Sequence, residues 1–583
     1  MKYGTDAHRV TFIVLRYMRR PILVLVSVYA ISMVGWVMIP GVNVDGNPEP
    51  LSFFHAFYFL TYTATTTGFG EIPYSFSDAQ RMWSIISLYA GVVAWLYAVG
   101  SIIRLLQNPH FRYALAERRF ARFVARIHEP FVILCGFGNT GSLLARGLSD
   151  AGMTAVVIDK DIDRINALQL RDYRVAMPGL CADAQVPAVL ANAGLLSQNC
   201  KAIVALTNNE DVNLKVAVSA RLLNPSVQVI AQSTSALHEE AIATLGSDVH
   251  IVDPFQTYGH YLGATIDNPA IYVLNRWLAG DKGADLDAVP TLPRGKWILC
   301  GYGRMGRRIR EALNNLRIET AIIDPEIGEG DEFPPNFVRS RASQTALLEA
   351  GVSEASGIVA GTDDDAYNLS ILLNARTLNP KIFMIVRQEL HMNERLFRVA
   401  GAQLIMQPNL VSARRILFEL IAPLLKPFLE RVRAARIDGN DGFLRHVFDQ
   451  LREHVGNDSV PRLWTVHIDK RSAPAALRVI ENGSDVRLRD LFRHPANREH
   501  RLGCVALVVR TAENIRVMPD QFYRLNDGDQ ILLCGKDRDL HLLEATLHNE
   551  YTLDYLITGD DAPRGYVMQW VMRRLNGDQP GVT

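Results

Sequence analysis

Hydrophobic and polar positions divide the chain into an apolar amino-terminal part and a longer part in which short apolar runs alternate with amphipathic segments. Residues 21–43 carry no charged side chain, and a second uncharged run covers 82–103, between Arg81 and Arg104. Because about 20 apolar residues in a helix cross the hydrocarbon core of a bilayer, both runs predict membrane-spanning helices. A cleaved signal peptide is the alternative for the first run, but no small-residue cleavage site follows it.

The segment between the two apolar runs predicts a short helix followed by a loop rich in threonine and glycine. Ser52 can cap a helix from Phe53 to about Tyr62, which is too short to span. The loop reads Thr-Ala-Thr-Thr-Thr-Gly-Phe-Gly-Glu over residues 63–71. In a potassium selectivity filter, backbone carbonyls replace the hydration shell of the ion. The candidate filter residues, of which the first four supply carbonyls to K+, are Thr66, Thr67, Gly68, Phe69 and Gly70.

Glycine has a specific use in such a filter and in the helix below it. A carbonyl-lined filter alternates between right- and left-handed backbone, and Gly68 and Gly70 stand where the left-handed conformation is required. A threonine- and glycine-rich loop without a pore is the alternative. Gly91 lies in the second apolar run as a candidate hinge of the inner helix, and a simple packing glycine is equally consistent with its position.

The remaining chain contains the same series of strand, glycine loop, helix, strand and acid twice. The first glycine loop, Gly136-Phe-Gly-Asn-Thr-Gly141, leads to Asp159, and the second, Gly301-Tyr-Gly-Arg-Met-Gly306, leads to Asp324. Both landmarks repeat at one offset, because 301 − 136 = 165 and 324 − 159 = 165. In dinucleotide-binding folds the glycines admit a pyrophosphate and the acid binds ribose hydroxyls. Apolar runs alternating with helical patterns then predict two doubly wound parallel sheets.

The candidate nucleotide-binding residues follow the carboxyl ends of the predicted strands. In the first copy they are Gly136, Gly138, Asn139, Thr140, Gly141, Asp159, Asn208 and Asp211. In the second copy they are Gly301, Gly303, Arg304, Met305, Gly306, Asp324 and Asp363. Arg304 adds positive charge beside the pyrophosphate path, whereas Glu326 disfavours a 2′-phosphate, so the second copy favours NAD over NADP. The alternative is that one or both copies keep the glycines only for packing.

Charge and cysteine usage narrow the class of protein. The 61 basic and 61 acidic residues give a net charge of +0, which is not the footprint of a nucleic-acid-binding protein. The six cysteines lack CxxC spacing and indicate reduced thiols in the cytosol. Basic residues concentrate before the first apolar run and after the second. The positive-inside rule therefore places both termini on the cytoplasmic side of a plasma (inner) membrane.

The loop at 63–71 resembles the Thr-Val-Gly-Tyr-Gly motif of potassium channels, with Thr67 in place of Val, Phe69 in place of Tyr, and Glu71 in place of the usual Asp. Together with the two repeats, the chain resembles two-transmembrane K+ channels with tandem RCK (regulator of K+ conductance, TrkA-type) domains, most of all the GsuK-type multi-ligand-gated channels. The resemblance implies a homotetrameric pore above a cytosolic gating ring. It also implies that a small nucleotide, NAD or another adenine nucleotide, acts as a regulatory ligand.

Many RCK channels are instead gated by Ca2+ through acidic residues after the fourth and fifth strands. This chain has Ala205, Gln232 and Thr234 at those positions, so that site does not carry over. Carboxylate oxygens suit Ca2+, which leaves other acidic residues as candidate divalent ligands. They are Asp364, Glu329 and Asp331.

The expected fold class is a membrane α-helical two-span pore joined to cytosolic α/β domains, namely two Rossmann-like sheets and a small α+β carboxyl-terminal subdomain. The expected parts are a cytosolic amino terminus (1–20), the pore domain (21–106), a linker (107–129), the first RCK domain (130–280), a linker (281–294), the second RCK domain with crossover helices (295–437) and a TrkA-C-like subdomain (438–583).

We expect a ligand-gated, K+-selective channel and no enzyme activity. A weakly selective cation channel is one alternative, since Thr67 is less apolar than Val behind the filter. A membrane-anchored NAD-dependent oxidoreductase is another, but it lacks an evident catalytic base and leaves the filter motif unexplained.

Overall fold

The structure is a computed structural model that describes residues 6–42, 47–65, 67–71, 75–244, 246, 249–280, 284–289, 292–326, 335–437, 441–457 and 460–559. The chain forms two compact units. One contains the residues up to His128 together with Ala191–Gly194, and the other contains the remaining residues.

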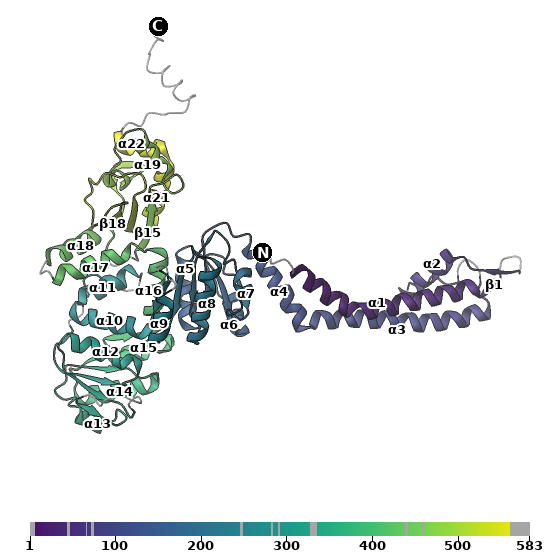
Figure 1. The fold of residues 1–583 in the computed structure, drawn as a ribbon, viewed down its shortest axis with the longest axis horizontal. Coiled ribbons are helices and arrows are strands. Elements are labelled where there is room, and N and C mark those ends of the chain that lie inside the picture. Colours follow the sequence, from purple (N-terminus) through teal and green to yellow (C-terminus); the bar gives the residue numbers. More distant parts are fainter. Residues whose placement is uncertain are drawn as a thin grey trace, which may run out of the picture. The chain divides into compact units, whose positions relative to one another are not determined.

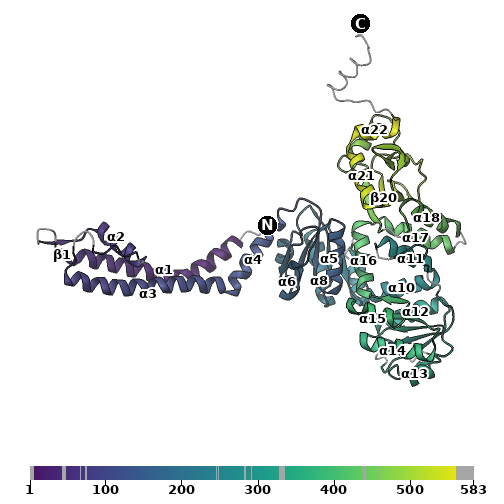
Figure 2. The ribbon, with the colours of Figure 1, turned by 180° about the vertical axis from the view of Figure 1, so that it is seen from behind.

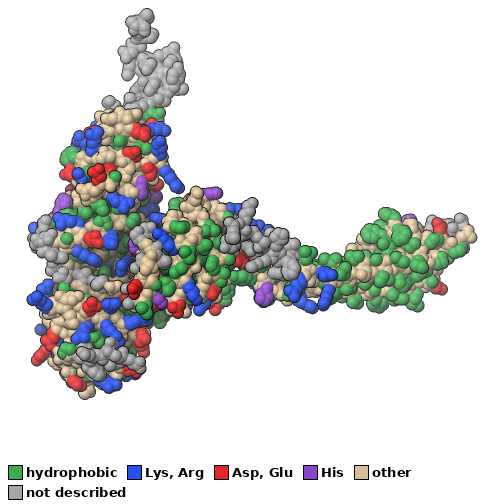
Figure 3. Space-filling model, in the orientation of Figure 1, with side chains coloured by type: hydrophobic (Ala, Val, Ile, Leu, Met, Phe, Trp, Pro, Cys, Tyr) green, Lys and Arg blue, Asp and Glu red, His purple; other side chains and the backbone are tan. Residues whose placement is uncertain are grey.

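The first unit is built from two long helices that lie side by side, α1 (Asp6–Met38) and α3 (Asp78–Gln107) (Figures 1 and 2). Val14–Met38 and all of α3 are long and apolar enough to cross a bilayer. On the face that Figure 3 shows, the side chains around these helices are mostly hydrophobic, apart from a group of basic side chains near the end that leads to α4. Such a surface suits lipid, so the two predicted spans are confirmed.

The boundaries of the two long helices differ slightly from the apolar runs. The helix α1 begins before Pro21 and ends at Met38. After it, β1 (Pro40–Val42) pairs with β2 (Pro48–Pro50) in a short antiparallel ribbon. The third helix begins at a capping box in which Ser77 and Gln80 exchange side-chain and backbone hydrogen bonds. The helix α4 (Pro109–Val124) follows α3 after the single cap residue Asn108.

A short helix, α2 (Phe53–Ala64), lies between the two spans as predicted. The side chain of Ser52 accepts a hydrogen bond from the His55 amide, which caps the helix. Its buried face belongs to an aromatic cluster in which the ring of Trp36 lies 4.4 Å from that of Phe59 and 4.8 Å from that of Phe76. This cluster ties α1, α2 and the segment before α3 together.

The second unit contains two six-stranded sheets of the same topology. The first has the order β5-β4-β3-β6-β7-β8 and the second has the order β11-β10-β9-β12-β13-β14, and every pairing is parallel. Strands covered by helices on both faces are apolar throughout, which explains the continuous hydrophobic runs. Two doubly wound sheets are therefore confirmed.

The elements of the first sheet are β3 (Phe131–Cys135), α5 (Asn139–Asp150), β4 (Thr154–Asp159), α6 (Ile162–Gln169), β5 (Gly179–Cys181), α7 (Pro187–Asn192), β6 (Cys200–Ala205), α8 (Glu210–Leu223), β7 (Gln228–Gln232), α9 (Ala236–Ala243) and β8 (Val249–Val252). Those of the second are β9 (Trp297–Cys300), α12 (Arg304–Asn315), β10 (Thr320–Ile323), β11 (Phe337–Val338), α13 (Gln344–Glu349), β12 (Gly357–Ala360), α14 (Asp365–Leu378), β13 (Phe383–Arg387), α15 (Glu394–Val399) and β14 (Leu404–Met406).

Each sheet sends the helix after its last strand to the other sheet. The helix α10 (Pro254–Asp267) follows the first sheet and packs on α12 of the second, and α16 (Pro408–Ile421) follows the second sheet and packs on α5 of the first (Figure 1). The helices α11 (Pro269–Leu278) and α17 (Leu425–Ile437) continue these two crossovers. The apolar side of α10 is buried in a core with the second sheet, and that of α16 is buried in a separate core with the first sheet.

The carboxyl-terminal part is a small α+β subdomain, as expected. Its antiparallel sheet has the order β15-β20-β18-β19, beside a two-stranded ribbon of β16 and β17. The elements are α18 (Asp441–His454), β15 (Arg462–His467), α19 (Pro474–Glu481), α20 (Leu488–Leu491), β16 (Arg493–His494), β17 (Asn497–Arg501), β18 (Cys504–Arg510), β19 (Ile515–Val517), β20 (Gln530–Gly535), α21 (Asp537–His548) and α22 (Glu550–Thr558). All six cysteines of the chain are free.

Candidate pore and nucleotide sites

Two glycines of the loop after α2 have the left-handed backbone conformation that was predicted for them. Gly68 has a φ of +65° and Gly70 a φ of +95°. A Cβ added to either glycine would meet no atom within 4 Å, so the glycines answer a conformational need and not a lack of space. Thr66 lies outside the described residues.

The pore helix holds this loop through one tyrosine that the sequence did not single out. Tyr62 is buried, and its hydroxyl donates to the carbonyl oxygen of Gly70 at 2.5 Å. The carbonyl of the same tyrosine accepts the amide of Thr67 at 2.9 Å. Both ends of the described filter segment are therefore fixed to the last turn of α2. In the sequence, the only sign of this role of Tyr62 is that an aromatic residue stands near the end of the short helix.

Gly91 lies within an unbroken α3, buried on the side that faces α1 and α2. It borders a small cavity with Tyr29, Ser32 and Thr63. A Cβ at this position would meet no atom within 4 Å, so no neighbour within the chain requires a glycine here. The hinge assignment therefore stays a prediction.

The first glycine loop forms the floor of a polar cavity of about 430 Å³ at the carboxyl edge of the first sheet. Gly136 has a φ of +101°, and a Cβ on Gly141 would lie 2.1 Å from the carbonyl oxygen of Gly136, so both positions exclude a side chain. The helix α5 begins after Gly138 without a side-chain cap. Its first amide groups remain available to a bound anion, an arrangement that suits a pyrophosphate.

Of the eight residues predicted for this first copy, five lie in or under the cavity, whereas Gly136, Gly141 and Asp211 are not among the residues that line it. Gly138, Asn139, Thr140 and Asn208 line it. Asp159 lies beneath, with its side chain only 4% exposed. Asp211 has a side chain that is 76% exposed, is not among the residues that line this cavity, and faces His238.

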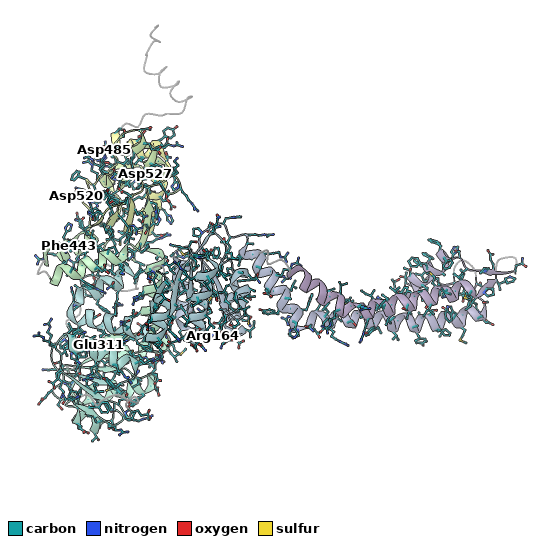
Figure 4. The ribbon with its side chains drawn as sticks, viewed as in Figure 1. Arg164, Glu311, Phe443, Asp485, Asp520 and Asp527 are labelled. Atoms are coloured by element: carbon teal, nitrogen blue, oxygen red, sulfur yellow. The ribbon has the colours of Figure 1, made fainter. Side chains whose placement is uncertain are left out.

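Asp159 supports the glycine loop directly. Its Oδ2 atom accepts the Phe137 amide at 2.6 Å, and its Oδ1 atom accepts the Asp161 amide at 2.8 Å. The guanidinium of Arg164 lies 3.4 Å from Oδ2. Figure 4 labels Arg164 on the part of the ribbon that contains the first sheet. The acid therefore joins the loop that would hold the pyrophosphate to the strand end that would hold the ribose.

Several residues that the sequence analysis did not name also line the first cavity. Arg164, Ala167 and Arg171 follow one another at helical spacing along α6 and its end, and so share one face. Asn409 reaches the cavity from α16, where its Oδ1 atom lies 3.0 Å from the Thr140 hydroxyl. The helical spacing of the two arginines after Asp159 could have indicated that they share one face. Asn409 reaches the cavity only because the crossover brings α16 to the first sheet.

The second glycine loop repeats this local geometry. Gly301 has a φ of +99°, and a Cβ on Gly306 would lie 2.1 Å from the carbonyl oxygen of Gly301. Asp324 accepts the Tyr302 amide at 2.5 Å, just as Asp159 accepts the Phe137 amide in the first copy. Met305 is buried.

Arg304 begins α12 in the second glycine loop, and its side chain has partners outside that loop. Its guanidinium lies 4.6 Å from the ring centre of Phe255, donates to the Thr234 hydroxyl at 2.9 Å and lies 3.8 Å from Glu210. These partners belong to the first sheet and its crossover helix. The positive charge expected beside the second pyrophosphate path is therefore used between the two sheets.

The acidic residues considered for a divalent ion have other roles or lie outside the described residues. Asp364 caps α14 by accepting the amides of Ala366 at 2.9 Å and Tyr367 at 3.1 Å. Glu329 and Asp331 fall outside the described residues. Within the described part of the chain, no group of three or more His, Cys, Asp and Glu side chains is placed to hold a metal ion.

The fold and these sites define a membrane protein that joins a two-span pore segment to tandem dinucleotide-type domains. An "Ion channel" family model matches residues 23–108, and a "TrkA-N domain" model matches 132–253 and 297–408. The chain therefore contains one segment of the "Ion channel" family and two segments of the "TrkA-N domain" family.

Curated relatives are similar to parts of this chain. "Potassium channel protein 1" of Methanocaldococcus jannaschii is 25% identical over 38% of this chain and 65% of that protein. "Voltage-gated potassium channel Kch" of Escherichia coli is 25% identical over 38% of this chain and 51% of that protein. The matches thus span less than two thirds of either relative. A solved structure described as "GsuK channel bound to NAD" is 18% identical, covers 93% of this chain and 100% of that chain, and has a TM-score of 0.47.

Proposed function

We propose that the protein is a ligand-gated, K+-selective channel whose cytosolic RCK domains bind a nucleotide. The observation that carries the proposal is the filter segment with positive φ at Gly68 and Gly70, held between two membrane-spanning helices. Carbonyls of Thr66, Thr67, Gly68 and Phe69 are assigned to K+, which is the transported ion. Because a filter of this kind encloses its ion with several copies of one loop, the working form is a homotetramer.

The membrane arrangement follows from the charges beside the spans. Exposed arginines, including Arg16, Arg19, Arg104 and Arg112, gather at the ends of α1 and α3 away from the filter. This distribution supports a plasma (inner) membrane location with both termini cytoplasmic. The nucleotide domains then face the cytosol, where NAD and other adenine nucleotides are found.

We assign the regulatory nucleotide to the first RCK domain. The amide groups of α5 suit its phosphates, Asp159 holds the glycine loop through the Phe137 amide, and Arg164 with Arg171 supplies positive charge. The second copy keeps the glycine loop, but its arginine is engaged elsewhere. Divalent regulation is not part of the proposal, and no step requires the protein to be an enzyme.

A nucleotide can gate the pore only by binding one state of the channel more tightly than the other. Because α5 packs on α16 of the second sheet, a ligand at the α5 amino terminus acts on the joint between the two RCK domains. Thr140 and Asn409 meet at that joint inside the cavity. Occupancy of the cavity therefore bears directly on how the two domains pack.

The test is a planar-bilayer recording of the purified protein in a K+/Na+ gradient, before and after NAD+ is added to the cytosolic side. A reversal potential near the K+ equilibrium value, with an open probability that changes on adding NAD+, is expected. K+-selective current that ignores both NAD+ and ADP would contradict nucleotide gating. A reversal potential near zero would support the weakly selective channel that Thr67 permits, and the absence of current would contradict the pore assignment.

A further inference from the structure

Exposed arginines gather at the end of the two spans that lies away from the filter. They stand on α1, in the last turn of α3 and in the first part of α4, at Arg16, Arg19, Arg20, Arg104 and Arg112. Figure 3 shows basic side chains in this region, near the end that leads to α4. We call these five residues the arginine belt.

A hydrogen bond between α1 and the start of α4 places the arginine belt at one level. The side-chain amide of Asn108 donates to the Tyr17 hydroxyl at 2.8 Å, and its carbonyl oxygen accepts the His110 amide at 2.9 Å. At the other end of the same two long helices, the Gln80 side chain donates to the Ile39 carbonyl at 3.3 Å. The helices α1 and α3 are therefore antiparallel. Every arginine of the belt stands within four positions of Tyr17 or Asn108, which is about 6 Å along a helix axis.

This level corresponds to the depth of the lipid headgroups. The uncharged part of α3, residues 82–103, is about 33 Å long, close to the hydrocarbon thickness of about 30 Å. Arg104 follows directly after this stretch. Tyr17 and Tyr113 stand beside the arginine belt and are 41% and 44% exposed. Tyrosine is enriched where a protein passes from hydrocarbon to water, because its ring is apolar and its hydroxyl is polar.

The arginine belt has no acidic partner. The sequence contains no Asp or Glu in residues 7–44 or 79–116. In the part of the chain that the structure describes, no carboxylate forms an ion pair with an arginine of the belt. Five like charges at one level repel one another, so an anion from outside the chain that neutralises them is favoured.

We propose that the arginine belt binds the phosphodiester headgroups of anionic phospholipids in the cytosolic leaflet. A guanidinium fork matches two phosphate oxygens, and the negative surface of that leaflet attracts basic residues beside a span. Arg104 precedes the break at Asn108 and Arg112 follows it, so bound lipid holds both sides of the point where α3 passes into α4. Lipid binding here is separate from K+ selection and nucleotide binding, and it depends on the proposed function only for the cytoplasmic position of the two termini.

The experiment measures lipid binding to the full-length protein in detergent. Native mass spectrometry counts the phosphatidylglycerol or phosphatidylcholine molecules that stay bound, and thermal unfolding measures how far each lipid raises the melting temperature. R19Q/R112Q removes one belt charge from α1 and one from α4. R119Q/R126Q is the matched control, because both arginines are exposed but stand at least 11 positions beyond Asn108, since 119 − 108 = 11.

The unchanged protein and R119Q/R126Q are expected to bind phosphatidylglycerol in preference to phosphatidylcholine, and phosphatidylglycerol should give the larger rise in melting temperature. R19Q/R112Q is expected to bind phosphatidylglycerol about 25-fold more weakly, because each basic residue near an anionic surface contributes about fivefold. R19K/R112K keeps both charges but loses the planar forks, so a smaller loss is expected.

Equal binding of the two lipids by the unchanged protein would overturn the proposal. Phosphatidylglycerol binding to R19Q/R112Q that equals binding to R119Q/R126Q would also overturn it. Inorganic phosphate that stabilises the protein as strongly at the same concentration would identify a general anion site and overturn the assignment to lipid. If R19Q/R112Q fails to assemble, R104Q and R126Q decide by the same comparison. None of these readouts uses ion flux, so a protein without K+-selective current would overturn the proposed function alone.

Discussion

At the scale of single residues, two glycines set the backbone of the candidate filter, and two charged residues meet beside the candidate nucleotide cavity. The glycines matter through backbone conformation, because the space around them is free. The charged residues matter through direct contact, since Asp159 and Arg164 lie 3.4 Å apart at the cavity. Each case predicts that a substitution at the site has a larger effect than a similar substitution elsewhere in the chain.

Replacing Gly68 by Ala is expected to abolish K+ flux. A φ of +65° costs an L-residue about 1–2 kcal/mol, so the loop would relax to another conformation and move its carbonyls off the axis. The measurement is K+ uptake into liposomes that contain the purified channel. Gly100→Ala is the matched control, because that glycine also has free space around it but lies within α3. Equal flux in the two variants would contradict the filter conformation.

Replacing Arg164 by Gln is expected to weaken nucleotide binding at least about tenfold, because a hydrogen bond to a charged group is worth about 1.5–3 kcal/mol. Asp159→Asn is expected to act in the same direction through the glycine loop that Asp159 supports. Calorimetric titration of the full-length protein with NAD+ and with ADP measures both variants. Asp324→Asn is the control from the second copy, and an effect there but not at Arg164 would move the assignment to that copy.

At the scale of elements, each of the two crossover contacts has a glycine where the two helices pack closely. A Cβ on Gly147 of α5 would lie 2.6 Å from Leu417 of α16, and a Cβ on Gly263 of α10 would lie 3.0 Å from that of Ala312 in α12. The large residue therefore lies on the crossover helix in one contact, while both partners are small in the other. Two contacts of the same topology have found different packing solutions.

Gly147→Leu is expected to destabilise the protein by about 1–3 kcal/mol, the usual cost of overpacking a core. The companion change Leu417→Ala makes room, so the double variant should be more stable than the sum of the two single effects predicts. Thermal unfolding of the full-length protein in detergent gives the four values of the cycle. Strict additivity would show that α5 and α16 do not pack as described.

The thiols at the strand ends are expected to stay unreactive in the folded protein. Burial raises the pKa of Cys135 and Cys300 well above the usual range and raises that of Cys504 to about 12. Below these pKa values the thiols are protonated, and maleimide reacts with the thiolate. Mass spectrometry after labelling at pH 8 should therefore find these positions modified only when denaturant is present. Rapid labelling of the native protein would contradict their burial.

At the scale of the whole molecule, nucleotide binding and folding are linked. A ligand that binds only the folded protein stabilises it by about 2.7 kcal/mol at one hundred times its dissociation constant. Binding that is tenfold weaker lowers this stabilisation to about 1.4 kcal/mol at the same concentration, so NAD+ or ADP should raise the melting temperature of the Arg164→Gln variant about half as much as that of the unchanged protein. A rise of equal size in both proteins would place the ligand somewhere other than the first cavity.

Much of the fold and part of the site follow from local patterns in the sequence. Apolar runs of sufficient length indicate the spans, and apolar runs that end on glycine loops and an acid indicate the two sheets. Gly68, Gly70, Gly136 and Gly301 all have positive φ, a conformation that is set within a few residues. Local signals of this kind are readable because their physical cause lies next to them in the chain.

The tertiary structure alone decided what happens between distant segments. Arg304 turns to Phe255 and Thr234, Asn409 enters the cavity of the other domain, and Glu71 meets Arg81. Long polar side chains have many rotamers. Which partner each one contacts therefore depends on which helix the fold brings beside it. The sequence by itself therefore determined the elements, the repeat and the backbone of the filter, because those depend on local conformation and burial. Only the packing of α10, α16 and α3 determined which charges meet, because that depends on contacts between separate elements.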